Sequence, residues 1–178
     1  MKFLRIKRII ILLTVLAMFA CNGRVMEEKE KETKPVTGPG DLIEANKLMV
    51  KSEDQRIEDF IRRYGWQMET KGSGLRYMIY HEGKGEKADA GKIAMIDYTL
   101  SLLSGDTVYT SENEGIKSIP LGKGTAESGL EEGILLLNVG DKAKFIIPSH
   151  LAFGLFGDAK KVPAKATLVY DIELIELK

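Results

Sequence analysis

Residues Gly129–Lys178 read GLEEGILLLNVGDKAKFIIPSHLAFGLFGDAKKVPAKATLVYDIELIELK, and they combine one helical pattern with two strand patterns. Ser128 and Glu131 have the spacing of a capping box, which predicts a helix that begins at Gly129 and stops near Asn138–Gly140. Leucine and isoleucine recur along this helix at the spacing of a single buried stripe.

Two segments after this helix alternate between apolar and polar residues, as strands with one buried face do. Asp141–Pro148 and Thr167–Leu177 each place their apolar side chains on one face, namely Ala143, Phe145, Ile147, Leu168, Tyr170, Ile172 and Leu174. Four earlier segments continue the predicted sheet: Gly74–His81, Ile93–Leu102, Thr107–Ser111 and Ile116–Leu121. A short helix among such strands predicts an α+β fold in which a strongly bent antiparallel sheet wraps around one short helix.

The same region resembles the FKBP-type peptidyl-prolyl isomerases in a series of short motifs. In chain order they are Asp97-Tyr98-Thr99, Leu121-Gly122-Lys123-Gly124, Gly129-x-Glu131-Glu132-Gly133, Val139-Gly140-Asp141-Lys142-Ala143, Ile147-Pro148, Ala152-Phe153-Gly154 and Pro163-Ala164-x-Ala166 with the strand that follows. Any one of these motifs is weak evidence, but their number, order and spacing are specific. The resemblance implies an FKBP-like fold and prolyl isomerase activity.

Five residues occupy positions that form the apolar pocket in this family. Tyr98 matches an aromatic wall, Val108 an apolar wall and Leu130 the pocket floor. Val162 matches an apolar residue of a loop, and Tyr170 an aromatic residue of the last strand. The resemblance therefore implies that proline-containing polypeptides bind among these side chains.

Four further pocket positions depart from the family pattern. Tyr109 stands where an Asp is usual, and Ala126 stands where Val is common. Glu127 replaces a branched residue whose backbone N–H faces the ligand, and Phe153 replaces a Tyr whose hydroxyl would bond a carbonyl. These differences argue against tight macrolide binding and predict a subdued isomerase activity.

Prolyl isomerisation is compatible with a pocket of this composition. The barrier to rotation is about 18–20 kcal/mol because the amide loses its conjugation in the twisted state. That twisted state is less polar than the planar amide, so an apolar pocket that excludes water stabilises it preferentially. The reaction therefore needs no general acid, general base or cofactor.

Other chemistry has little support in the sequence. His81 and His150 have no Cys or second His at the spacing of metal ligands, so we expect no metal site. The adjacency of Ser149 and His150 does not place their side chains in the geometry of a catalytic triad.

The first twenty residues are typical of a secretory signal peptide. Four bases and no acid lie in residues 1–20, and an apolar run from Ile9 to Ala20 follows the bases. As a helix this run spans only about 18 Å, which is too short for a bilayer core of about 30 Å. The run ends at Cys21, as in the lipobox of bacterial lipoproteins, although Met18 and Phe19 are unusual there. An ordinary cleaved signal is the alternative to a lipoprotein signal peptide.

The segments that follow predict a tethered domain. Residues 21–40 are charged and poor in apolar residues, which predicts a disordered tether that is lipidated at Cys21. Residues 41–73 are helical in pattern, as two short helices or as one helix kinked near Ser52, where Ser52 and Gln55 are spaced as a capping box. We expect this segment to pack on its own domain, residues 74–178, rather than to form a dimerising arm.

The charge balance agrees with a secreted protein that does not bind nucleic acid. The 178 residues hold 26 bases and 26 acids, and four of the bases lie in the predicted signal peptide. The remainder is therefore mildly acidic. We interpret the chain as a monomeric peptidyl-prolyl cis-trans isomerase of extracytoplasmic polypeptides, attached to a membrane of the bacterial cell envelope through Cys21, with its domain in the periplasm or on the outer surface. The alternative is a non-catalytic, proline-binding chaperone or an interaction subunit of an envelope complex.

Overall fold

The computed structural model describes residues 39–178. The predicted signal peptide, Cys21 and almost all of the predicted tether lie outside the described residues. Within residues 39–178, no helix combines the length and the hydropathy that crossing a bilayer requires.

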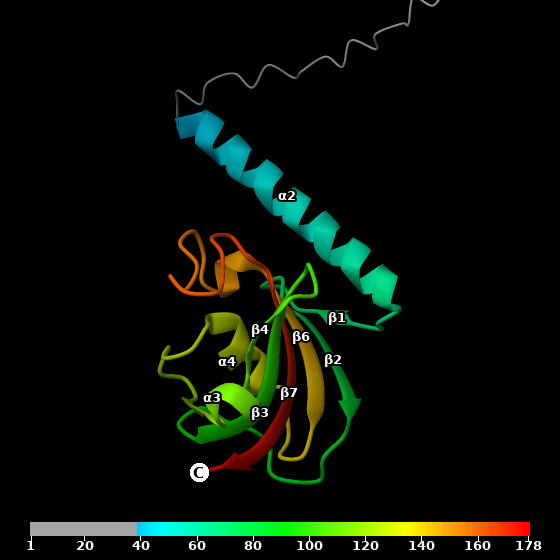
Figure 1. The fold of residues 1–178 in the computed structure, drawn as a ribbon, viewed down its shortest axis with the longest axis vertical. Helices are drawn as coiled ribbons and strands as arrows, with labels where there is room; N and C mark the ends of the chain where they lie inside the picture. Colours follow the sequence, from blue (N-terminus) through cyan, green and yellow to red (C-terminus); the bar gives the residue numbers. More distant parts are fainter. Residues whose placement is uncertain (1–38) are drawn as a thin grey trace, which may run out of the picture. The chain divides into compact units, whose positions relative to one another are not determined.

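The described residues contain a seven-stranded antiparallel sheet that confirms the predicted fold class. Its strands are β1 (Glu69–Thr70), β2 (Arg76–His81), β3 (Ile93–Leu102), β4 (Thr107–Thr110), β5 (Lys117–Pro120), β6 (Lys142–Ile147) and β7 (Leu168–Leu177). Six strands pair in the order β1-β2-β6-β7-β3-β4, and β5 pairs with the other end of β3. Figure 1 shows these strands curving around the short helix α4 (Ser128–Ile134).

The concave face of the sheet and helix α4 enclose the main core. The alternation predicted from the sequence is confirmed, because the inward residues of β3, β6 and β7 are buried in one apolar cluster. Two glycines allow α4 to approach β6 closely: a Cβ on Gly133 would lie 2.7 Å from the Phe145 ring, and one on Gly129 would lie 2.4 Å from a methyl group of Ile147. These contacts give the GLEEG motif a packing role.

The capping box predicted at Ser128 and Glu131 is wrong. Helix α4 begins at Ser128 with Glu127 as its N-cap, and no side chain caps it. The Ser128 hydroxyl donates to the Leu151 carbonyl at 3.3 Å, while the Glu131 carboxylate accepts from the backbone N–H groups of the preceding loop. Both side chains form hydrogen bonds with residues outside the helix, so their spacing did not predict the N-cap.

The N-terminal segment is one continuous helix, α2 (Pro39–Tyr64), and the predicted break near Ser52 is wrong. No Pro or Gly interrupts the sequence between Gly40 and Gly65, so nothing forces a kink. The helix ends in a Schellman arrangement in which Gly65 has φ of +66° and the Trp66 N–H donates to the Ile61 carbonyl.

The C-terminal half of α2 packs on the outer face of the sheet, on the side opposite α4. Ile57 and Phe60 are buried against Ile146 of β6 and Val169 of β7. The nearly buried guanidinium of Arg76 on β2 adds ion pairs with Asp54 and Glu58 on successive turns of α2, at 3.1 and 3.2 Å. The expectation that the helix packs on its own domain therefore holds for this half of α2.

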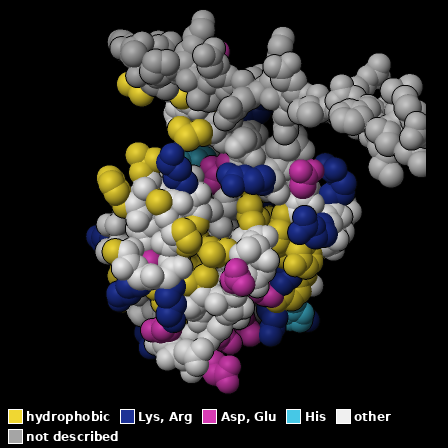
Figure 2. All heavy atoms as spheres, turned by 45° about the horizontal axis from the view of Figure 1, so that its top comes forward, with side chains coloured by type: hydrophobic (Ala, Val, Ile, Leu, Met, Phe, Trp, Pro, Cys, Tyr) yellow, Lys and Arg dark blue, Asp and Glu magenta, His cyan; other side chains and the backbone are white. Residues whose placement is uncertain are grey.

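The apolar residues of the N-terminal half of α2 are exposed: Leu42, Ile43, Leu48, Met49 and Val50. Figure 2, which brings this end of the domain forward, shows hydrophobic side chains interspersed with Lys and Arg.

Substitution of isoleucine at two positions of α2 tests this packing. Ile57 is fully buried and Ile43 is 59% exposed. Ile57→Ala should lower the free energy of unfolding by about 2–5 kcal/mol, whereas Ile43→Ala should change it by less than about 0.5 kcal/mol. Urea unfolding followed by the fluorescence of the single tryptophan, Trp66, measures both. Equal effects of the two substitutions would contradict the docking of α2.

Candidate functional site

A cavity of about 270 Å³ opens on the concave side of the sheet. It lies where β3, β4 and β7 meet the loop that follows β6 and the segment from α3 (Ser111–Glu114) through β5 to the start of α4. The residues that line it are Tyr98, Leu100, Tyr109, Glu114, Lys117, Glu127, Phe153, Asp158, Lys160 and Tyr170. Aromatic rings from four separate elements therefore surround one space.

The pairing of β3 with β7 sets the innermost wall of this cavity. Leu100 of β3 lies opposite Tyr170 of β7, and Tyr98 lies opposite Ile172. Both tyrosines point to the concave face, with ring centroids 6.1 Å apart and planes at 46°. Because Tyr170 is fully buried and Tyr98 nearly so, this wall is held by core packing.

Glu127 is a nearly buried carboxylate at the side of the cavity. It accepts a hydrogen bond of 3.1 Å from the Tyr170 hydroxyl and lies 3.5 Å from the Lys117 ammonium. Burial, together with the neighbouring Glu127 carboxylate, raises the pKa of Tyr170 well above its usual value. The phenol therefore stays protonated at neutral pH and remains a donor to Glu127. The Lys117 ammonium also lies 5.7 Å from the centre of the Tyr98 ring.

Asp158 organises the opposite rim of the cavity. Its carboxylate accepts from the Tyr109 hydroxyl at 2.5 Å and from the backbone N–H groups of Lys160 and Val162 at 2.8 Å each. Burial alone would raise the pKa of Asp158, but hydrogen bonds from Tyr109 and from the backbone outweigh it and lower the pKa below its ordinary value. The Lys161 ammonium lies 4.7 Å from the centre of the Tyr109 ring. Asp158 thus joins the tip of the loop to β4.

The residues predicted for the pocket fall into three groups. Five of them line the cavity together: Tyr98, Tyr109, Glu127, Phe153 and Tyr170. Ala126 lines an adjoining depression that shares Lys117, Glu127 and Phe153 with the cavity. The remaining three are buried in the core and do not line the cavity: Val108, Leu130 and Val162.

The resemblance implied Val108 as a wall of the pocket, but the cavity is lined by its neighbour Tyr109. The pairing of β3 with β4 shifts register between Leu100 and Ser101, so Tyr109 lies opposite Leu100. As a result Tyr109, rather than Val108, presents its side chain to the cavity, and Val108 is turned into the core. A bulge of this kind inserts one residue into one strand and re-aims the side chains beyond it.

Sequence reasoning missed five residues of the cavity lining: Leu100, Glu114, Lys117, Asp158 and Lys160. Leu100 follows Tyr98 by two residues on the same strand, so the alternation of side chains predicts that it lies on the same face as Tyr98. The others are charged residues in the loop between β6 and β7 or at the ends of α3 and β5, where no periodic pattern predicts an inward direction. Within residues 39–178, no group of three His, Cys, Asp or Glu side chains is placed to hold a metal ion.

Comparison with known proteins bears directly on this site. The family model for FKBP-type peptidyl-prolyl cis-trans isomerases matches residues 84–175, which carry β3 to β6, most of β7, α4 and the whole cavity lining. This chain belongs to the FKBP-type peptidyl-prolyl cis-trans isomerase family. Family membership accounts for the order of the sheet and for the place of α4 inside it.

Individual relatives extend the match. The chain is 38% identical over 107 residues to the FKBP-type peptidyl-prolyl cis-trans isomerase FkpA of Aeromonas hydrophila, covering 60% of this chain and 39% of FkpA. It is 37% identical over 106 residues to FK506-binding protein 2 of Yarrowia lipolytica, covering 58% and 73% of the two chains. The crystal structure of AtFKBP13 superposes with a TM-score of 0.61 at 27% identity, covering 64% of this chain and all of AtFKBP13. The chain spans about half or less of the length of the FkpA relatives it matches.

The hydrogen bond between Tyr109 and Asp158 makes a prediction about pH. The pKa of Asp158 is lower in the folded protein than in the unfolded chain, where an Asp has a pKa of about 3.9. The ionised carboxylate therefore adds its full contribution to the free energy of unfolding above the unfolded pKa, and this contribution is lost as the pH falls through the folded pKa. Tyr109→Phe removes one cause of the lowering and should raise the pKa. Carboxyl ¹³C NMR of Asp158 measures the titration, with Tyr64→Phe as a control remote from the loop. An unchanged midpoint in Tyr109→Phe would show that the hydrogen bond does not act on Asp158.

Proposed function

We propose that the protein is a peptidyl-prolyl cis-trans isomerase whose substrate binds in the cavity between Tyr98, Tyr109, Phe153 and Tyr170. The observation that carries this proposal is the set of four aromatic side chains around one space of about 270 Å³, in a chain of the FKBP-type family. Rings of this kind exclude water from a proline ring and its imide bond. They thereby stabilise the less polar, twisted transition state relative to the planar amide.

The charged side chains of the cavity are compatible with that chemistry because most of them are already engaged. Glu127 is satisfied by Tyr170 and Lys117, and Asp158 by Tyr109 and two backbone N–H groups. We assign them to fixing the walls of the site.

The Tyr98 hydroxyl is the donor that we assign to the substrate. The hydroxyls of Tyr109 and Tyr170 are committed to Asp158 and Glu127, and Phe153 has none. No hydrogen bond within the described part of the chain engages the Tyr98 hydroxyl, and Tyr98 lines the cavity. Burial, followed by the charges of Glu114 and Glu127, raises the pKa of Tyr98, so its hydroxyl stays protonated at neutral pH.

Tyr98→Phe tests this assignment in the full-length chain. We expect the wild type to accelerate isomerisation of a tetrapeptide with an apolar residue before proline. Tyr98→Phe should lower kcat/KM by about two- to tenfold, as loss of one neutral hydrogen bond does, without a change in unfolding midpoint. Tyr64→Phe, at the C-terminal end of α2 and outside the cavity lining, should leave kcat/KM unchanged.

Two outcomes of that experiment would overturn the proposals separately. A wild-type rate equal to the uncatalysed background would remove the isomerase proposal and favour a non-catalytic binder of proline-containing segments. Catalysis that survives in full in Tyr98→Phe would leave the isomerase in place and remove Tyr98 as the donor.

We further propose that the protein acts on polypeptides outside the cytoplasm as a lipid-anchored monomer of the cell envelope. The basic residues, the apolar run and Cys21 at its end support the anchor. The packing of α2 on its own sheet supports the monomer.

Cys21→Ser should abolish labelling with a radioactive fatty acid, because the single cysteine of the chain provides the thiol for acylation. The variant should also lose its resistance to extraction from membranes by carbonate. A Cys21→Ser protein that still incorporates label would exclude lipidation at this residue.

A further inference from the structure

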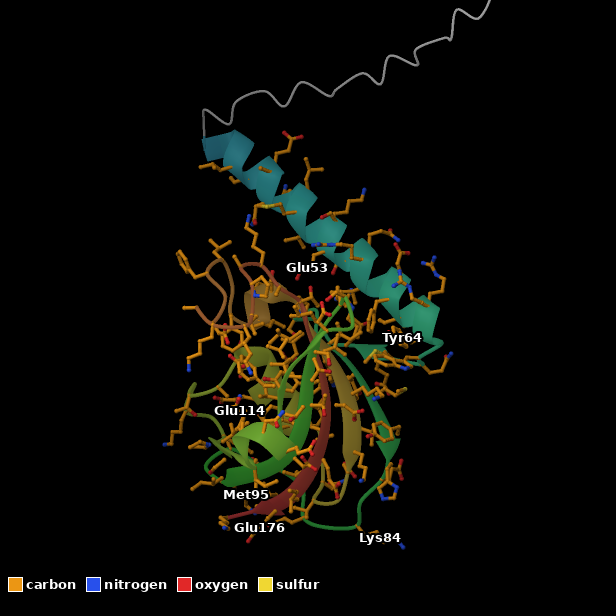
Figure 3. All side chains as sticks on the ribbon, viewed as in Figure 1. Glu53, Tyr64, Lys84, Met95, Glu114 and Glu176 are labelled. Carbon is orange, nitrogen blue, oxygen red and sulfur yellow. The ribbon has the colours of Figure 1, made fainter. Side chains whose placement is uncertain are left out.

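Glu53 occupies an unusual place on α2. It lies one turn before Ile57 on the face that packs against the sheet, where an apolar residue would continue the stripe, and it is only 7% exposed. Figure 3 shows Glu53 on the side of α2 that faces the domain. No Lys or Arg within residues 39–178 pairs with it, since Arg76 pairs with Asp54 and Glu58 instead. A buried carboxylate is costly unless several donors satisfy it.

Three donors reach the Glu53 carboxylate, and all of them come from two residues that lie about a hundred positions from Glu53 in the sequence. The Ser149 N–H donates to Oε1 at 2.7 Å, and the Ser149 hydroxyl donates to Oε2 at 3.0 Å. The Thr167 hydroxyl donates to Oε1 at 2.6 Å. One side chain of α2 therefore binds Ser149, two residues after the end of β6, and Thr167, directly before β7.

Ser149 and Thr167 are the two ends of the loop that carries one wall of the cavity. We call residues Ser149–Thr167 the wall loop, because Phe153, Asp158 and Lys160 line the cavity from it. Inside the loop, the Lys165 N–H donates to the Gly154 carbonyl at 2.8 Å and holds its two branches together. Outside its internal bonds, the loop is bound by Glu53 at its base and by Tyr109 near its tip. Further hydrogen bonds join Leu151 to Ser128, His150 to Ser73 and Lys161 to Val108, but none of these connects both ends of the loop.

We propose that Glu53 is a positioning residue for the isomerase site: its carboxylate holds both ends of the wall loop, so that Phe153 and Asp158 stay against Tyr98 and Tyr109. This inference rests on the proposed function only for its effect on turnover. Docking of α2 does not require it, because Ile57, Phe60 and Arg76 already bind the helix to the sheet. A carboxylate at this position therefore accepts hydrogen bonds from both ends of the wall loop, which an apolar residue could not do.

Substitutions at both sides of the contact test the proposal in the full-length chain. Glu53→Leu continues the apolar stripe of α2 but removes every acceptor, and Thr167→Val removes one donor at nearly constant volume. Both should speed hydrogen exchange of the Gly154 and Lys165 amides and move the ¹³C-detected pKa of Asp158 up toward its ordinary value. Both should also lower kcat/KM by about three- to tenfold, since misplaced substrate contacts cost catalysis more than binding energy alone suggests.

Two further variants separate positioning from general stability. Glu53→Gln keeps an acceptor for Ser149 and Thr167 and can donate to the Ser149 hydroxyl, so it should restore most of the protection and turnover. Glu58→Leu removes a carboxylate of the same helix that contacts Arg76 and not the wall loop, so it should leave both readings at wild-type values.

The outcomes distinguish this inference from the proposed function. An inactive wild type would overturn the isomerase proposal, while the exchange rates and the Asp158 titration would still report whether Glu53 orders the loop. Wild-type exchange at Gly154 and Lys165 in both Glu53→Leu and Thr167→Val would overturn the positioning role. Loss of protection throughout the sheet in both variants would also overturn it, because Glu53 would then support the whole fold rather than the loop.

Discussion

The pairing of β3 with β7 is the contact on which the rest of the domain depends. It joins residues that lie 66 to 83 positions apart in the sequence and runs from Ala94 opposite Leu177 to Leu102 opposite Leu168. Because side chains alternate along paired strands, this register sends one apolar row inward, where it meets α4 and forms the core. The same row continues into the cavity as Tyr98, Leu100 and Tyr170. The site is therefore an unfilled end of the core, and three of its four aromatic residues lie on strands of the sheet.

Charged residues hold the parts of the site that the sheet does not. Glu127 connects the start of α4 to Tyr170, Asp158 connects the tip of the wall loop to Tyr109, and Glu53 connects the base of that loop to α2. Each carboxylate is satisfied by hydroxyl or backbone donors from another element, which is how a polar group becomes tolerable near a core. Loops and a helix terminus acquire in this way the fixed geometry that a pocket for a twisted imide requires.

The sequence predicted those features that depend on local periodicity. Strand β3 was predicted with its observed bounds, Ile93–Leu102, and the inward rows of β6 and β7 are those that the alternation indicated. Features set by distant partners were not predictable in this way. Ser128 and Glu131 have the spacing of a capping box, but their side chains form hydrogen bonds with residues outside the helix. The bulge that turns Tyr109 rather than Val108 to the cavity is not visible in the spacing of apolar residues. No sequence pattern singled out Glu53, because its three donors come from residues about a hundred positions away.

The measurement that tests this account most directly is the position of a bound proline. A saturating tetrapeptide with leucine before proline, ¹³C-labelled in its proline ring, would be added to the full-length chain, and intermolecular nuclear Overhauser effects would be recorded. The account predicts contacts from the proline ring to the rings of Tyr98 and Tyr170, and it predicts none when alanine replaces proline in the peptide. Contacts confined to α2 or to the outer face of the sheet would contradict the claim that the cavity beside the β3–β7 pair is the prolyl site.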